Sequence, residues 1–197
     1  MILAVDTASY AASVALVDGG RSVEACFWAT DGHAHRIFQE IEGLLARAGT
    51  PLEQVDCFAA AAGPGSFTGV RVALSAVKAL AEVCGRPVAA VSSLRALAWF
   101  GSAPLRAPIL DARRGEVYTA LYDADLRLAA PEIAVRLEDW LDVVAARRAE
   151  RIDAVPPNLA LAVARIAERD FAAGLAVDPL LADANYVRPP DIRVPAA

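Results

Sequence analysis

Short apolar runs separated by turn residues open the chain, and they predict strands. Ile2–Asp6 and Ser13–Val17 are mostly apolar, and Ser22–Trp28 follows the turn Asp18-Gly19-Gly20. An Asp-Gly pair between two strand-like runs is typical of a β-hairpin. Two or three antiparallel strands are therefore expected before the first helix.

Apolar residues recur at helical intervals from about residue 35 onwards. They stand three or four positions apart up to Ala48, and Gly49 followed by Pro51 ends this helix. The elements expected beyond it are, in chain order, a strand at 57–62, a helix at 68–84, a strand at 88–91, a short helix to about 99, paired strands at 109–110 and 116–122, a strand at 125–135, and helices at 137–149 and 157–170.

The order of these elements predicts the fold class. Three strands followed by helix, strand, helix and strand indicate an α/β fold in which helices pack on a mixed sheet. Gly101, Pro104 and Pro108 stand close together and predict a boundary between subdomains at 1–100 and 101–197.

The helix expected at 68–84 is apolar around most of its circumference. At about 100° per residue, apolar side chains occupy an arc of about 220° around the helix. A helix on the surface of a protein needs an apolar arc of roughly half that width. One apolar face suits the sheet, and the second consists of Val72, Ala76, Ala79 and Val83. Either the chain's own second half or a helix of a partner protein must cover that second face, and both interpretations stay open.

Composition narrows the classes of protein. Of the 197 residues 56% are hydrophobic and 22% charged, which excludes intrinsic disorder, and the net charge of −5 disfavours a protein that binds nucleic acid by itself. The apolar runs are too short for a membrane span, and Ile2–Asp6 lacks the basic residues that precede a signal sequence, so a cytoplasmic location is expected. The three cysteines are widely spaced, as in a reduced protein.

The run Gly63-Pro64-Gly65-Ser66-Phe67-Thr68-Gly69 is the most distinctive motif of the chain. It follows an expected strand and opens a helix, where backbone N–H groups can hold an anion. It lacks the lysine of a phosphate-binding P-loop. A tight turn capped by Ser66 or Thr68 is the favoured interpretation, and anion binding is the alternative.

Two acidic residues are candidates for a metal or phosphate site. Asp6 ends the first strand with Thr7, and Asp111 stands near Arg113 and Glu116. The competing interpretations are a turn-capping role for Asp6 and ordinary ion pairs for Asp111. His33 and His35, the only histidines, are two positions apart and are expected in a solvated loop ahead of a helix.

Four segments together resemble one family. They are Ile2–Thr7, Ala62–Arg71, Asp111–Tyr118 and Tyr186–Asp191, and they are similar to TsaB (also called YeaZ), the accessory subunit of bacterial tRNA threonylcarbamoyladenosine synthesis. The resemblance spans the whole chain, although residues 130–180 are shorter than is usual in the family.

The resemblance implies a fold and a role. The fold is an actin-like (ribonuclease H-like) ATPase fold of two related subdomains, with helices on both faces of a mixed sheet and the second subdomain reduced. The implied role is that of a non-catalytic scaffold. It pairs with a TsaD-like subunit, which modifies the adenosine next to the tRNA anticodon, and a TsaE-like ATPase joins them. Alone the chain is expected to form a homodimer, and tRNA is expected to bind only through the complex.

The resemblance also places the partner interface on the helices expected at 35–48 and 68–84. The candidate interface residues are Arg71, Val72, Ser75, Ala76, Lys78, Ala79, Val83, Gln39, Gly43 and Ala46. The candidate nucleotide or anion contacts are Asp6, Thr7, Gly65, Ser66 and Thr68.

Cofactors are expected on the partner subunits rather than on this chain. Actin-like ATPases usually hold phosphate with a glycine-containing turn after the first aspartate, and residues 6–11 contain no glycine. ATP or ADP and metal are therefore expected on the partners, with no tight ATP binding and no metal centre here. The alternative function is a small metal-dependent phosphotransferase or ATPase that uses Asp6 and Asp111.

Overall fold

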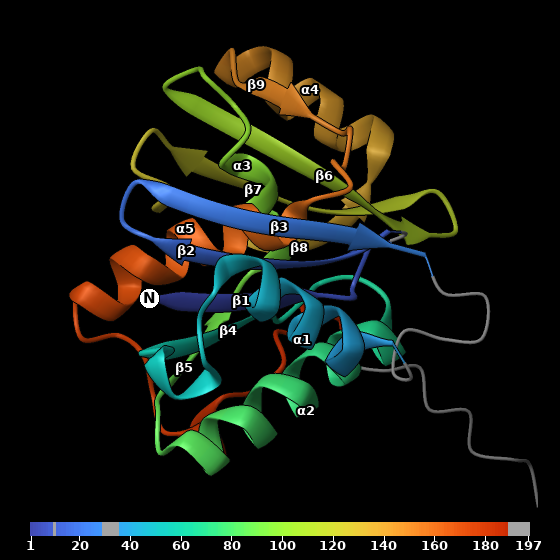
Figure 1. Ribbon diagram of the computed structural model, residues 1–197. Coiled ribbons are helices and arrows are strands. Elements are labelled where there is room, and N and C mark those ends of the chain that lie inside the picture. Colours follow the sequence, from blue (N-terminus) through green and yellow to red (C-terminus); the bar gives the residue numbers. More distant parts are fainter. Residues whose placement is uncertain (10, 29–35, 189–197) are drawn as a thin grey trace, which may run out of the picture.

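The first part of the chain forms a five-stranded mixed sheet (Figure 1). The computed structural model describes residues 1–9, 11–28 and 36–188. The strand order is β3-β2-β1-β4-β5, in which β2 pairs antiparallel with β1 and β3, while β4 runs parallel to β1 and β5. The strands are β1 (Ile2–Asp6), β2 (Ala12–Asp18), β3 (Arg21–Phe27), β4 (Cys57–Ala61) and β5 (Val88–Val91).

Helices cover both faces of this sheet, which explains why its central strands are apolar on both sides. Helices α1 (Ile37–Ala48) and α2 (Phe67–Cys84) lie on one face, and α5 (Leu159–Ala172) lies on the other (Figure 1). Every residue of β1 and β4 is buried as a result. Helix α5 is held at its start by the Ser13 hydroxyl of β2, which accepts a hydrogen bond from the Ala160 amide at 3.0 Å.

A second, four-stranded sheet repeats most of the first. Its order is β8-β7-β6-β9, with β6, β7 and β8 antiparallel in succession and β9 parallel to β6, as β1 to β4 are in the first sheet. Strand β5 has no counterpart in this sheet within the described part of the chain. The elements are β6 (Leu105–Arg113), β7 (Glu116–Asp123), β8 (Leu128–Arg136), α4 (Leu137–Arg147) and β9 (Glu150–Ile152). The predicted α/β, actin-like fold with a reduced second subdomain is thereby confirmed.

The two sheets are joined through a layer of helices. The short helix α3 (Ser93–Ala98) contacts β6 and β7 of the second sheet and also α5, which packs on the first. Arg95 of α3 fixes this arrangement with two hydrogen bonds to the Asp170 carboxylate of α5, at 2.6 and 3.0 Å. Among the described residues, no helix is long and apolar enough to cross a bilayer.

The predicted strands and α-helices agree with the structure to within a few residues, with two exceptions, and the short 3₁₀ helices at Leu52–Gln54 and Pro179–Leu181 were not expected either. Strand β9 was not expected, because three residues carry too little pattern. Strand β6 begins at Leu105 and runs through Pro108, where only a two-residue strand had been expected at 109–110. The division at residue 100 stays a prediction, and α5 from the second half packs on the first sheet.

The segment that follows α5 returns along the first sheet. Val177 exchanges two backbone hydrogen bonds with Val88 at the β5 edge, at 2.8 and 2.9 Å, and a short 3₁₀ helix, η3 (Pro179–Leu181), comes next. Asn185 then donates its amide N–H to the Ala62 carbonyl at 2.7 Å. We refer to residues 177–188 as the tail segment.

Candidate functional site

The glycine-rich run is a tight turn between β4 and α2. The Ser66 hydroxyl caps α2 by accepting a hydrogen bond from the Gly69 amide at 3.3 Å, so the capping interpretation is confirmed for Ser66. Thr68 is a residue of the first turn of α2 and is exposed. The turn is also fastened to the end of β1, because the Ser66 amide donates to the Ala8 carbonyl at 2.9 Å.

The glycines of this turn are required by neighbouring backbone. A Cβ atom at Gly69 would lie 1.8 Å from the Thr7 carbonyl oxygen, and one at Gly65 would lie 2.9 Å from that of Ala8. The Thr7 hydroxyl completes the contact with a hydrogen bond of 2.6 Å to the Gly69 carbonyl. Close packing within the chain therefore accounts for these glycines without a bound phosphate.

Asp6 is fully buried at the end of β1, and its carboxylate caps the turn that follows. One carboxylate oxygen accepts a hydrogen bond from the Ala8 amide at 2.8 Å, and the other accepts one from the Ser9 hydroxyl. Burial raises the pKa of this carboxyl to about 6, and the hydrogen bonds with Ser9 and Ala8 oppose the rise. This geometry is that of the turn-capping aspartate considered above.

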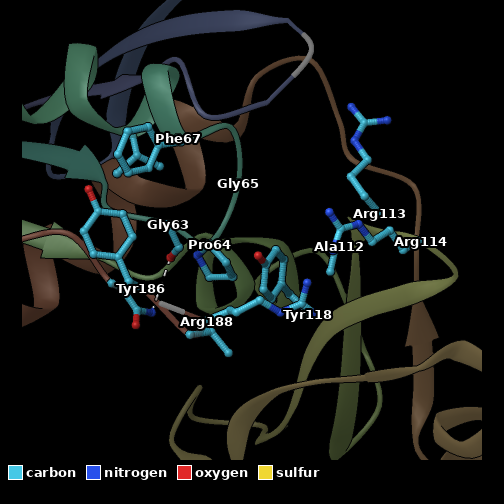
Figure 2. A pocket seen from close by; sticks show the side chains of 13 residues that line it. Gly63, Pro64, Gly65, Phe67, Ala112, Arg113, Arg114, Tyr118, Tyr186 and Arg188 are labelled. Carbon is cyan, nitrogen blue, oxygen red and sulfur yellow. Dashed lines mark hydrogen bonds between the residues drawn. The ribbon is translucent and has the colours of Figure 1, made fainter. Parts of the chain in front are cut away.

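Two cavities open beside the glycine-rich turn. The first, of about 530 Å³, lies between the turn, the β6–β7 hairpin and the tail segment. Figure 2 shows Phe67 and Tyr186 on one side of it and Arg113 and Arg114 on the opposite side. The second, of about 650 Å³, is lined by Ser66 and Asp111 among others. Asp6 lines neither cavity, so the structure does not join it with Asp111 in a shared site.

Asp111 and Arg113 belong to an exposed hairpin. Asp111 accepts a hydrogen bond from the Arg113 amide at 2.8 Å and forms an ion pair with its guanidinium at 3.4 Å. Arg113 and Arg114 both have left-handed backbone, with φ of 66° and 58°. The ordinary ion pair expected as an alternative for Asp111 is therefore present. Among the described residues there is no group of three or more potential metal ligands.

An apolar groove separates α1 from α2 at the N-terminal half of α2. It has a volume of about 440 Å³ and is lined by Ile37 and Phe38 of α1 and by Phe67, Thr68, Arg71, Val72, Ser75 and Ala76 of α2. Phe38 is 50% exposed and Phe67 is 44% exposed. Large apolar side chains that line an exposed groove are typical of a surface that binds another molecule.

The second face of α2 is covered only in part. Ala76 is buried in the main core of the chain itself, so of the two open interpretations a partner helix is not needed to cover this residue. Ala79 and Val83 are exposed and Val72 is half-buried. An outward stripe of α2 therefore remains, which also includes the exposed Ser75.

The tail segment contacts two polar residues of α2. Lys78 donates a hydrogen bond to the Ala182 carbonyl at 2.8 Å, and Arg71 donates one from its Nε to the Tyr186 hydroxyl at 3.1 Å. Two candidate interface residues thus contact the chain's own tail segment, and the exposed stripe lies beside them.

The candidate residues on α1 lie on its exposed side. Gln39 and Ala46 are exposed and Gly43 is half-buried, with the spacing of residues on one helix face. A Cβ atom at Gly43 would meet only the Arg47 guanidinium, at 3.6 Å, so nothing within the described chain requires a glycine. His33 and His35 lie outside the described residues.

Comparisons with known proteins agree with this architecture. A family model for tRNA N6-adenosine threonylcarbamoyltransferase, TsaD, matches residues 28–190. The structure of YeaZ from Pseudomonas aeruginosa superposes with a TM-score of 0.81 at 32% sequence identity, over 94% of this chain and 98% of that one. The chain belongs to the TsaB (YeaZ) family.

Two curated TsaB proteins support the assignment. TsaB of Bacillus subtilis (strain 168) is 36% identical over 149 residues, which are 73% of this chain and 65% of that protein. TsaB of Escherichia coli (strain K12) is 40% identical over 129 residues, 63% of this chain and 55% of that protein. Both are termed tRNA threonylcarbamoyladenosine biosynthesis proteins. The chain thus spans between about half and two thirds of the curated TsaB proteins it matches.

The sequence analysis missed a polar cluster that ties the parts of this TsaB-family chain together. The Glu132 carboxylate of β8 accepts hydrogen bonds from Ser92, from Tyr122 and, at 2.5 Å, from the Asn185 side chain. It links the first sheet, the second sheet and the tail segment. An acidic residue between the apolar neighbours Pro131 and Ile133 was the one available signal, and nothing in the sequence identified its partners.

Replacing Gly69 by alanine should destabilise the protein strongly. The new Cβ atom would overlap the Thr7 carbonyl, and we expect the free energy of unfolding to fall by about 3 kcal/mol or more. Urea unfolding followed by circular dichroism measures this. Gly20→Ala is the control, since a Cβ atom at Gly20 has no neighbour within 4 Å. Equal stability of the two variants would contradict the packing argument.

The Asp6→Asn variant should remove a pH dependence. The folded-state pKa of about 6 exceeds the ordinary value of 3.8, so the folded state binds more protons than the unfolded state between these values. Wild-type stability relative to the variant should therefore fall as pH rises from about 4 to about 6, by up to about 3 kcal/mol, and stay level above. Urea unfolding of both proteins at pH 4, 5, 6 and 8 measures the difference, and a constant difference would refute the assignment.

Proposed function

We propose that this chain is a non-catalytic scaffold subunit in tRNA threonylcarbamoyladenosine formation. It docks a TsaD-type catalytic subunit, which transfers the threonylcarbamoyl group to the adenosine beside the anticodon. Membership of the TsaB family supports the pathway, and the exposed stripe and groove of α2 support the docking role. That exposed surface is the observation that carries the proposal.

The burial and hydrogen bonding of Asp6 support a non-catalytic role. Both Asp6 carboxylate oxygens already accept hydrogen bonds within the turn, and the side chain is fully buried. Gly65 and Gly69 are in close contact with backbone of the chain itself. The first aspartate and the glycines packed beside it therefore stabilise backbone turns here. ATP, ADP and metal belong, in this proposal, to the TsaD-type and TsaE-type partners.

The alternative function, a metal-dependent phosphotransferase, needs Asp6 and Asp111 to act together. Asp6 lines neither of the two cavities beside the glycine-rich turn, whereas Asp111 lines the larger one. This separation disfavours the alternative. ATP turnover by the purified chain that is lost in Asp6→Asn would favour it over the scaffold.

Two helices form the proposed docking surface. The stripe of α2 presents small and apolar side chains at Ala79 and Val83, and α1 presents Gly43. A glycine within a helix costs about 1 kcal/mol relative to alanine, and no contact inside the described chain explains it. A partner helix that packs closely on α1 would explain it. In the absence of that partner, a second copy of this chain uses the same surface, and tRNA is bound only by the assembled complex.

Ala79→Arg should weaken docking strongly without unfolding the chain. Ala79 is exposed in the isolated protein, so the guanidinium is tolerated in solution but obstructs a packed partner helix. We expect the affinity for the TsaD-type subunit of the same organism to fall by about a hundredfold, measured by isothermal titration calorimetry. Ala146→Arg is the matched control, since Ala146 is an exposed residue of α4, at the other end of the molecule (Figure 1). Wild-type affinity in Ala79→Arg would refute the proposed docking surface.

Gly43→Ala should have opposite effects on stability and docking. The added Cβ atom has room, so the isolated chain should gain about 0.5–1 kcal/mol in its free energy of unfolding. The same methyl group should weaken association with the TsaD-type subunit. Urea unfolding and calorimetric titration measure the two effects. Increased stability with unchanged affinity would place Gly43 outside the interface.

A further inference from the structure

We propose that Tyr186 of the tail segment is a positioning residue for the groove between α1 and α2. It does not line the groove, and it acts on it through Phe67 and Arg71. This inference rests on the proposed function, because it takes the groove to be part of the docking surface. It adds that a residue outside that surface sets the arrangement of its rim.

Tyr186, Phe67 and Arg71 form one stack. The rings of Tyr186 and Phe67 have their centroids 5.7 Å apart, with planes inclined at 30°. The Arg71 guanidinium carbon lies 3.9 Å from the centroid of the Phe67 ring, and its Nε donates to the Tyr186 hydroxyl at 3.1 Å. Figure 2 shows the two aromatic side chains next to each other, one from the start of α2 and one from the tail segment.

This stack forms the wall between two hollows. Phe67 and Arg71 both line the groove, whereas Tyr186 lines the 530 Å³ cavity on the other side. Phe67 is 44% exposed, and its ring contacts the Tyr186 ring and the Arg71 guanidinium. A long side chain that is already ordered loses less conformational entropy when a partner docks. Tyr186 therefore raises the affinity of the groove by holding Phe67 and Arg71 in place.

The tail segment holds Tyr186 independently of this stack. On one side, Asn185 is bonded to the Ala62 carbonyl and to Glu132. On the other, Arg188 forms an ion pair with Glu116. Because these contacts fix the backbone on both sides of Tyr186, shortening its side chain should leave the tail segment in position and the fold intact.

The test compares Tyr186→Phe and Tyr186→Ala in binding to the TsaD-type subunit, with thermal stability measured in parallel. Removing the hydroxyl should weaken binding about threefold, and removing the ring about tenfold, with the melting temperature unchanged. Leu181→Ala is the matched control, since Leu181 is an exposed side chain of the same tail segment. Its affinity should equal that of the wild type.

A double-mutant cycle decides whether Tyr186 acts through Arg71. In an Arg71→Ala background, Tyr186→Phe should cause no further loss of affinity. An equal loss with and without Arg71 would overturn the inference, as would wild-type affinity in Tyr186→Ala. The Ala79→Arg variant distinguishes a failure of the positioning role of Tyr186 from a failure of the docking surface. If it loses binding while both Tyr186 variants keep it, only the positioning role is refuted; if it binds normally, the docking surface itself is refuted.

Discussion

The close approach of two backbone segments, at Gly69 and at Thr7, is the contact on which the arrangement of α2 depends. It brings the first turn of α2 against the end of β1 with no room for a side chain between them. The Ser66 cap, the Thr7 hydroxyl and the buried Asp6 carboxylate all support this one junction. Because α2 starts there, the junction determines which sides of the helix face the sheet, the tail segment and solvent.

The same junction bears on the proposed scaffold role. In this chain the carboxylate and the glycines at the ends of the parallel strands stabilise backbone turns. The outer surface of α1 and α2 is exposed in part. The second subdomain repeats four strands of the first in the same order, and α3 and α5 between the sheets hold the two together. In the proposed role, these parts hold the α1–α2 surface in a fixed shape.

Much of the architecture was predictable from the sequence, because long periodic patterns determine it. Local residue patterns predicted helix α2, the β2–β3 hairpin and the Ser66 cap. Strand β9 was too short to show a pattern. The covering of α2 was not predictable, since Ala76 and Ala79 have identical side chains and only the tertiary structure makes one buried and the other exposed. The cluster at Glu132 depends on residues 40 and 53 positions away, beyond any local signal.

The return of α5 to the first sheet has a consequence for synthesis of the chain. Strands β1, β2 and β4 leave the ribosome early, but the helix that covers one of their faces begins only at Leu159. Until then that face of the nascent sheet is apolar and open to water, a target for chaperones and proteases. A premature stop anywhere before α5 should therefore yield an aggregation-prone fragment rather than a smaller functional protein.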